Sequence, residues 1–401
     1  MPDGDPSAPA GGEVSAILAL MTDGTTASLR LGGSYLPLLD RARIYCCGIT
    51  PYDVTHLGHA ATFVWVDVLT RVLGASGVTP ELCRNVTDVD DVLFEAAARS
   101  GSAYDAFASV QQFRFDQDMR ALGVREPRFA PRARRNVAQV MTLAEALLAS
   151  GAAYFRDGSV YFRGAHTAQA AGLTRDEAES LAGEYGARLD DPAKDDKLDV
   201  AVWRRSSQDE PGWPSPWGTG RPGWHAECAA MSLSVLGPAV DVLSGGADLR
   251  YPHHAYQAAM VEAVTGVRPF ARSVFEVGVV RLDGAKMAKS TGNLVLVGDV
   301  LADHPAAALR LCLIDRPWAQ SWEYAEAELD AATDRLERLY RAAGRSSGRT
   351  LASGENPRAA ADAMGAALRD DLDVPAALAI AEEAGGGTAR SLIATLGLAE
   401  G

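Results

Sequence analysis

The chain has no surplus of basic residues. Its 401 residues include 38 lysines and arginines against 52 aspartates and glutamates, which gives a net charge of -14. A protein that holds nucleic acid normally presents a basic face to the phosphates. The charge balance therefore disfavours a broad nucleic-acid-binding surface, although it leaves room for a local basic patch.

Cysteines are few, and long apolar runs are missing. Five cysteines, an odd number in a long chain, do not indicate a disulfide framework and favour a reducing compartment. The apolar stretch from Val14 to Met21 is too short to cross a bilayer, and the first dozen residues lack the basic segment of a secretory signal. We therefore expect a cytoplasmic monomer or dimer with no membrane partner.

The apolar patterns predict an α/β protein. A buried strand at 41–47, a helix at 57–75 and a strand at 78–86 form the first half of a parallel, Rossmann-like sheet, whose ligands bind at the carboxyl ends of its strands. Strands at 240–243 and 274–280 indicate the second half. Other expected elements are helices near 90–99, 102–122 and 134–150, a β-hairpin over 153–162, an exposed connection over 186–222 and helices from Leu301 onward.

These patterns divide the chain into five regions, without internal repeats. They are a flexible N-terminal tail (1–25), the first half of the Rossmann domain (26–125), a connective insertion (126–222), the second half with a lysine-containing loop (223–300) and a helical C-terminal domain (301–401).

Two short motifs lie far apart in the chain, one from Thr55 to His59 and the other from Lys286 to Ser290. Small residues and imidazoles at the start of a helix leave backbone N–H groups and the positive end of the helix dipole free for phosphate. Loop lysines neutralise the charge that develops when a phosphate is attacked. Each motif alone is weak, but together and in this order they resemble the ATP-binding signatures of class I aminoacyl-tRNA synthetases.

Further motifs point to cysteine chemistry, namely Cys47–Asp53, Asn85–Asp91, Pro222–Cys228, Gly245–Leu249 and Pro252–His254. This set resembles cysteinyl-tRNA synthetase. The form of the first motif is more similar to a tRNA-independent relative, the cysteine ligase of mycothiol biosynthesis, which joins cysteine to the amine of glucosaminyl-inositol. The resemblance spans residues 40 to 310. It implies a ligase that forms an amide bond while cleaving Mg²⁺-bound ATP to AMP and pyrophosphate.

The resemblance also implies a Zn²⁺ site made by Cys47, Cys228 and His253. An open fourth position on zinc would bind the thiolate of cysteine far better than the hydroxyl of serine. The synthetases have a fourth ligand, a glutamate, where this chain has Gln257. The replacement leaves an open three-ligand site and agrees better with the ligase.

Other residues compete for the metal. His225 lies three residues before Cys228 on one helix face and is a rival ligand. Cys46 and Cys47 face opposite sides of a strand, so only one of them can reach the site. Cys46, Cys83 and Cys312 are better explained as packing residues.

By the same resemblance, Thr50, Thr87 and Trp224 bind the cysteine substrate, and the catalytic residues are His56, His59, Lys286 and Lys289. ATP is bound by Gly48, His56, Gly58, His59, Gly246, Asp248, Lys286, Lys289 and Ser290. The threonines could instead satisfy local backbone, and the tryptophan could simply pack on the sheet. We expect at least two of Asp88, Asp90 and Asp91 to cap a helix, and we offer Asp53 as a base for the second step only as a guess.

Three alternative functions stay open. Cysteinyl-tRNA synthesis is disfavoured by Gln257, by the acidic charge and by the roughly 110 residues after the lysine loop, which are few for a helical bundle plus an anticodon-reading module. A ligase for another small-molecule or peptide amine is compatible with the departures from the family pattern at Arg250, Ala255 and Ala288. A non-catalytic paralogue is disfavoured by the intact lysines and metal ligands.

Overall fold

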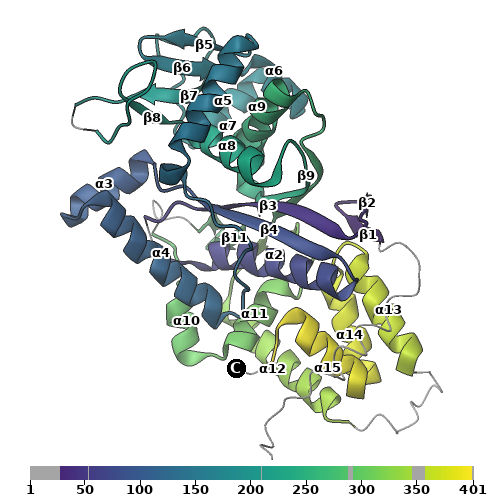
Figure 1. The fold of residues 1–401 in the computed structure, drawn as a ribbon. Coiled ribbons are helices and arrows are strands. Elements are labelled where there is room, and N and C mark those ends of the chain that lie inside the picture. Colours follow the sequence, from purple (N-terminus) through teal and green to yellow (C-terminus); the bar gives the residue numbers. More distant parts are fainter. Residues whose placement is uncertain (1–27, 53, 209, 288–291, 346–356, 400–401) are drawn as a thin grey trace, which may run out of the picture.

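The computed structural model describes residues 28–52, 54–208, 210–287, 292–345 and 357–399. The expected tail at 1–25 lies outside this range. A parallel sheet crosses the middle of the molecule, with the insertion on one side and the C-terminal helices on the other (Figure 1).

The central sheet has the strand order β10-β9-β3-β4, and all of its strands are parallel. Its strands are β3 (Arg41–Ile49), β4 (Thr79–Val86), β9 (Val240–Gly246) and β10 (Ala271–Val277). Helix α2 (Leu57–Ala75) connects β3 to β4, and α9 (Ala255–Thr265) connects β9 to β10. The predicted Rossmann-like α/β fold is confirmed, including both bounds of the first helix.

Successive side chains of β3 pack in two different hydrophobic cores. Ile44 and Cys46 pack in the core that contains α2, whereas Tyr45 and Cys47 pack in the core that contains α8 (Trp224–Leu236) and α9. Successive residues of a strand point to opposite faces, so the two adjacent cysteines are separated by the sheet, as predicted.

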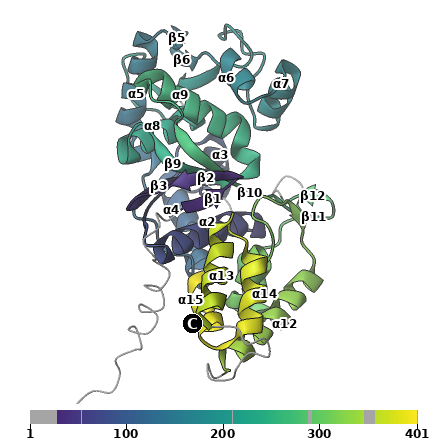
Figure 2. The same ribbon diagram turned by 90° about the vertical axis from the view of Figure 1, so that its right-hand side faces the viewer.

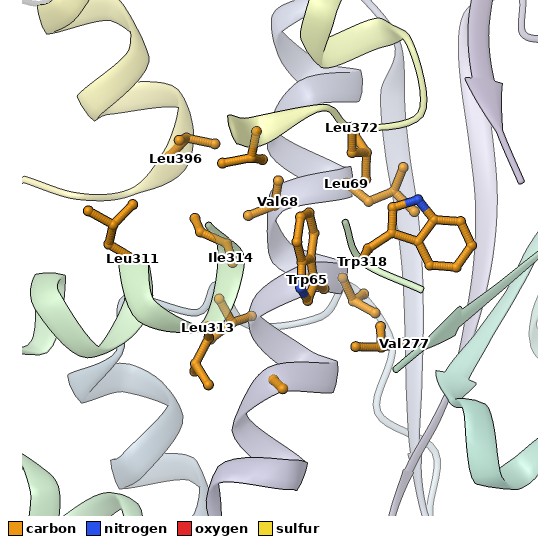
Figure 3. Close-up of a cluster of buried hydrophobic side chains, with 14 of the residues drawn as sticks. Trp65, Val68, Leu69, Val277, Leu311, Leu313, Ile314, Trp318, Leu372 and Leu396 are labelled. Carbon is orange, nitrogen blue, oxygen red and sulfur yellow. The ribbon is translucent and has the colours of Figure 1, made fainter. Parts of the chain in front are cut away.

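Helix α2 is buried almost all round, because the sheet covers one side of it and the C-terminal helices cover the other. The C-terminal helices are α10 (Val297–Asp303), α11 (Ala306–Ile314), α12 (Glu326–Ala343), α13 (Pro357–Arg369), α14 (Val374–Ala384) and α15 (Gly386–Leu396). Trp65 and Val68 of α2 point toward Leu311 and Ile314 of α11 (Figure 3). Figure 2 shows α12 to α15 gathered into a bundle below the sheet.

One buried charge network joins α2 to the C-terminal helices. The carboxylate of Asp67 accepts hydrogen bonds from Arg71 at 2.6 Å, from Arg125 at 3.2 Å and from the fully buried Arg310. Several donors compensate for the removal of this carboxylate from water.

The insertion contains an antiparallel sheet in the order β5-β6-β7-β8. It is preceded by the helix pair α3 (Asp91–Ser100) and α4 (Tyr104–Ala121), and it contains α5 (Val137–Ala149), β5 (Ala153–Arg156), β6 (Ser159–Phe162), α6 (Ala165–Ala170), α7 (Arg175–Glu184), β7 (Val200–Arg205) and β8 (Gly220–Pro222). The predicted hairpin over 153–162 is present. Its turn residues Asp157 and Gly158 have φ of 50° and 82°, as a tight two-residue turn requires.

The prediction of an exposed connection over 186–222 is wrong for β7 and β8. Val202 and Trp203 are fully buried, and β7 pairs with β6. Charged, proline and glycine residues around this short strand masked its apolar pattern.

Smaller strands complete the fold. The hairpin β1 (Ser28–Leu31) and β2 (Ser34–Pro37) packs near β10, while β11 (Val280–Leu282) pairs with β12 (Ala285–Lys286) and with β13 (Trp322–Glu323). The predicted strand at 274–280 is therefore two strands, β10 and β11. In the part of the chain that the structure describes, no helix is long and apolar enough to span a membrane.

Candidate active site

A cavity of about 580 Å³ opens at the carboxyl ends of the parallel strands. Every predicted site residue within the described part of the chain lines it: Cys47, Gly48, Thr50, His56, Gly58, His59, Thr87, Trp224, Cys228, Gly246, Asp248, His253 and Lys286. Lys289, Ser290, Ala288 and Asp53 lie outside the described residues. We call this cavity the main pocket.

Three buried side chains converge at one end of the main pocket. The ligand atoms of Cys47, Cys228 and His253 all lie within 4.8 Å of one another. They come from the end of β3, the first turns of α8 and the segment before α9. Burial raises the pKa of the Cys47 thiol well above its usual value, so its thiolate needs a neighbouring cation. Two cysteines and a histidine fit Zn²⁺, which takes sulfur and nitrogen ligands and favours the thiolate.

His225 lies beside this group rather than within it. Its Nδ1 atom is 2.9 Å from Nδ1 of His253. Burial lowers the pKa of His225 to about 3 and the pKa of His253 well below its usual value, so both rings are neutral and one donates to the other. When His253 is the donor, its Nε2 is free to bind a metal.

Gln257 contacts both cysteines and is fully buried. Its side-chain oxygen accepts a hydrogen bond from the Cys47 thiol at 3.5 Å, and its side-chain nitrogen donates to the carbonyl of Cys228 at the same distance. This neutral amide holds the two cysteines without adding a charged ligand.

Trp224 and the two threonines border the group of three ligands. The indole stacks on His253 with ring centroids 4.2 Å apart. The hydroxyls of Thr50 and Thr87 are 2.8 Å apart, and Thr87 donates to the carbonyl of Ile49 at 3.1 Å. The local backbone role considered for the threonines is therefore present in Thr87, while both hydroxyls still line the pocket.

The start of α2 also lines the main pocket. His56 caps this helix by accepting a hydrogen bond from the backbone N–H of Gly58 at 3.1 Å, and its ring stacks on His59 at 3.9 Å. Burial and the Lys286 ammonium lower the pKa of His59 to about 4. At neutral pH the His59 ring is therefore an uncharged hydrogen-bonding group. Position 48 must be glycine, because a Cβ there would lie 1.7 Å from the backbone oxygen of Asn85.

Asp248 and Lys286 also line the main pocket. The Lys286 ammonium donates to the Asp248 carboxylate. A Cβ at Gly246 would lie 2.3 Å from that carboxylate, so glycine at this position leaves space for the Asp248 side chain. Tyr185, at the end of α7, reaches the same point from the insertion, with its ring centroid 5.8 Å from the Lys286 nitrogen. No local sequence pattern indicates Tyr185, because its placement depends on how the insertion folds back.

The acidic run after β4 serves different purposes. Asp90 caps α3 by accepting from the backbone N–H of Val92 at 2.8 Å. Asp88 instead accepts from the backbone N–H of Arg134 at 2.9 Å. Asp91 forms ion pairs with two arginines of the insertion.

Comparisons with known proteins agree on one family. Residues 38–334 match the model of the tRNA synthetases class I (C) catalytic domain. The L-cysteine:1D-myo-inositol 2-amino-2-deoxy-alpha-D-glucopyranoside ligase of Nocardia farcinica is 44% identical over 84% of this chain and 82% of its own length. The ligase of the same name from Mycobacterium marinum has the same identity and the same coverage.

Solved structures share the fold at low identity. The methionyl-tRNA synthetase of Mycobacterium tuberculosis, in complex with methionyl-adenylate, superposes with a TM-score of 0.62 at 17% identity, over 90% of this chain and 82% of its own. A putative arginyl-tRNA synthetase from Campylobacter jejuni gives a TM-score of 0.60 at 14% identity, over 90% of this chain and 93% of its own. These likenesses show the fold alone.

Proposed function

The chain belongs to the family of L-cysteine:1D-myo-inositol 2-amino-2-deoxy-alpha-D-glucopyranoside ligases within the class I tRNA synthetase fold, and we propose that its main pocket carries out the ligation. The protein is an ATP-dependent ligase that activates L-cysteine and transfers it to the amine of glucosaminyl-inositol in mycothiol biosynthesis. What remains to be assigned is which residues of this chain perform each part of the reaction.

One observation carries the residue assignments. The Cys47, Cys228 and His253 group and the Asp248–Lys286 pair line a single pocket. A cysteine side chain at the three-ligand group and an adenosine ribose at Asp248 would bring the cysteine carboxylate near the start of α2, which lines the same pocket. That is the place where the α-phosphate of ATP must lie for attack.

In the first step, the cysteine carboxylate oxygen attacks the α-phosphorus of Mg²⁺-bound ATP and pyrophosphate leaves. The positive end of the α2 dipole stabilises the negative charge of the phosphate. His56 and His59 donate hydrogen bonds to the phosphates, and Lys286 moves from Asp248 to their negative charge. No protein nucleophile is needed, because positioning and charge stabilisation supply the catalysis.

In the second step, the amine nitrogen attacks the carbonyl carbon of cysteinyl-adenylate, and AMP leaves. The Trp224 indole closes the cysteine end of the pocket against water, while Thr50 and Thr87 orient the amino acid through their hydroxyls. A Zn²⁺ held by Cys47, Cys228 and His253 would bind the substrate thiolate and so select cysteine over serine.

The division of the chain follows from these roles. We propose that the two Rossmann halves (26–125 and 223–300) carry the main pocket, that the insertion (126–222) borders it and that the helical C-terminal region (301–401) supports α2. The acidic composition supports small-molecule substrates rather than a nucleic acid as the partner.

Exchange of labelled pyrophosphate into ATP tests the first step without any acceptor. We expect cysteine to support exchange, and we expect serine to be worse by several orders of magnitude. A single methylene-sized difference in an apolar pocket discriminates by only about 1–3 kcal/mol, so a larger ratio points to a bond with the thiolate. Comparable exchange with serine would contradict this assignment of the site.

A further inference from the structure

A second cavity, of about 550 Å³, lies beside the main pocket. We propose that this cavity, between the start of α3 and the folded insertion, binds the amine acceptor as a polyhydroxyl ligand that has no phosphate and carries one ammonium group. The inference rests on the proposed function and adds to it the place from which the second substrate reaches the adenylate. We call it the acceptor cavity.

The two cavities share part of their walls. Val92 and Trp224 line both of them, so the acceptor cavity adjoins the cysteine end of the main pocket. On the nucleotide side, Tyr185 lines the acceptor cavity and lies 5.8 Å from the Lys286 nitrogen. A ligand in the acceptor cavity is therefore next to the place where the cysteinyl carbonyl would lie, without occupying the position of cysteine or ATP.

The wall of the acceptor cavity is built from paired charges. Asp91 accepts hydrogen bonds from Arg204 and from the almost fully buried Arg221, at 2.9 Å from the latter. Arg221 also donates to Glu210 at 3.0 Å. These groups hold one another in fixed positions, and carboxylates and guanidinium groups fixed in this way can exchange hydrogen bonds with sugar hydroxyls.

The net charge of this wall decides between classes of acceptor. Five acidic side chains (Asp90, Asp91, Asp157, Asp191 and Glu210) and five basic ones (Arg188, Lys194, Arg204, Arg205 and Arg221) line the cavity. A nucleic-acid end or a sugar phosphate would need a surplus of positive charge. A balanced, polar wall suits a pseudodisaccharide without phosphates, whose volume fits an ordinary ligand pocket of roughly 300–1,000 Å³.

Asp90 is the carboxylate beside the shared wall. It accepts a hydrogen bond from the backbone N–H of Val92 at 2.8 Å, and it lines the acceptor cavity. Its neighbours Asp91 and Glu210 are already paired with arginines. An ammonium group that enters from the acceptor cavity therefore meets the Asp90 carboxylate first, next to Trp224 and the adenylate.

Two variants test the cavity by separate means. Asp90→Asn removes the charge but keeps the helix cap, because asparagine caps a helix as well as aspartate. Ala187→Trp fills the cavity from a loop residue that lines it and whose backbone N–H donates to the carbonyl of Ala182. Ala170→Trp is the matched control, since Ala170 is an exposed residue of α6 outside both cavities.

We expect Asp90→Asn and Ala187→Trp to raise the KM for glucosaminyl-inositol at least tenfold. Cysteine-dependent exchange of pyrophosphate into ATP should stay within twofold of the unmodified protein in both, and Ala170→Trp should change neither quantity. An unchanged acceptor KM in Asp90→Asn and Ala187→Trp would overturn the assignment of the cavity while leaving the proposed function intact. If the unmodified protein exchanges pyrophosphate but ligates no glucosaminyl-inositol, the proposed function fails instead.

Discussion

The adjacent residues Cys46 and Cys47 give a matched pair of variants for the proposed metal site. The sheet separates their side chains, and only Cys47 lies with Cys228 and His253. Alanine at either position removes one buried thiol from the same strand. We expect Cys47→Ala to lose zinc and Cys46→Ala to keep it.

The expected loss of zinc affinity can be worked out from the number of protein ligands. A structural zinc site with four protein ligands binds with about 10–16 kcal/mol, so one ligand contributes on the order of 3 kcal/mol, or roughly a hundredfold in Kd. His253→Ala should lose as much as Cys47→Ala. His225→Ala removes only the partner of His253 at 2.9 Å, and loss of such a supporting hydrogen bond weakens metal binding by roughly 10–100-fold.

The assay combines zinc content after dialysis with Kd from competition against a chelating dye. Thermal unfolding monitored by circular dichroism checks that each variant is folded, because Cys46→Ala also leaves a small cavity in a buried core. Equal zinc loss in Cys46→Ala and Cys47→Ala would refute the reasoning. Zinc loss in His225→Ala greater than in His253→Ala would make His225 the ligand.

Three further results are expected. Arg310→Met leaves the buried Asp67 carboxylate without its most buried partner and should lower the free energy of unfolding in urea by about 3–5 kcal/mol; a loss below 1 kcal/mol would contradict the role of this pair. Because the pKa of His59 is lowered to about 4 in the folded protein, the uncharged ring contributes stability that is present above pH 6.5 and is lost as the pH falls toward 4. His59→Gln should flatten this part of the stability profile, whereas the exposed control His166→Gln should not. Lys286→Ala should reduce pyrophosphate exchange by roughly 10²–10³-fold with unchanged zinc content, and normal exchange would exclude Lys286 from the first step.

The fold of the sheet was predictable because its signals are local. A buried strand, a turn and a helix with apolar spacing lie within one stretch of sequence, so the bounds Leu57 and Ala75 of α2 follow from the pattern itself. The hairpin over 153–162 was predictable for the same reason, since its turn residues select the backbone conformation. β7 was missed because Val202 and Trp203 lie among charged residues and are buried only by partners elsewhere in the chain.

The candidate site residues could be predicted because they lie in recognisable sequence motifs. The interactions among them could not be predicted in this way. The contact between His225 and His253 joins residues 28 positions apart, and the bonds of Gln257 to both cysteines depend on how α8 and α9 pack. The acceptor cavity is harder still to predict. In its wall, Asp91 pairs with Arg221, which lies 130 positions later in the chain. No local sequence pattern predicts that contact.

Competition between acceptors is the most direct test of the central claim. The protein is given cysteine, ATP, glucosaminyl-inositol and tRNA together, at low and moderate salt, and the products are identified by mass spectrometry. The proposed reaction predicts cysteinyl-glucosaminyl-inositol as the main product at both salt concentrations, because an acceptor without phosphates in a charge-balanced cavity does not rely on phosphate contacts. Cysteinylated tRNA as the main product, lost as the salt rises, would contradict the account.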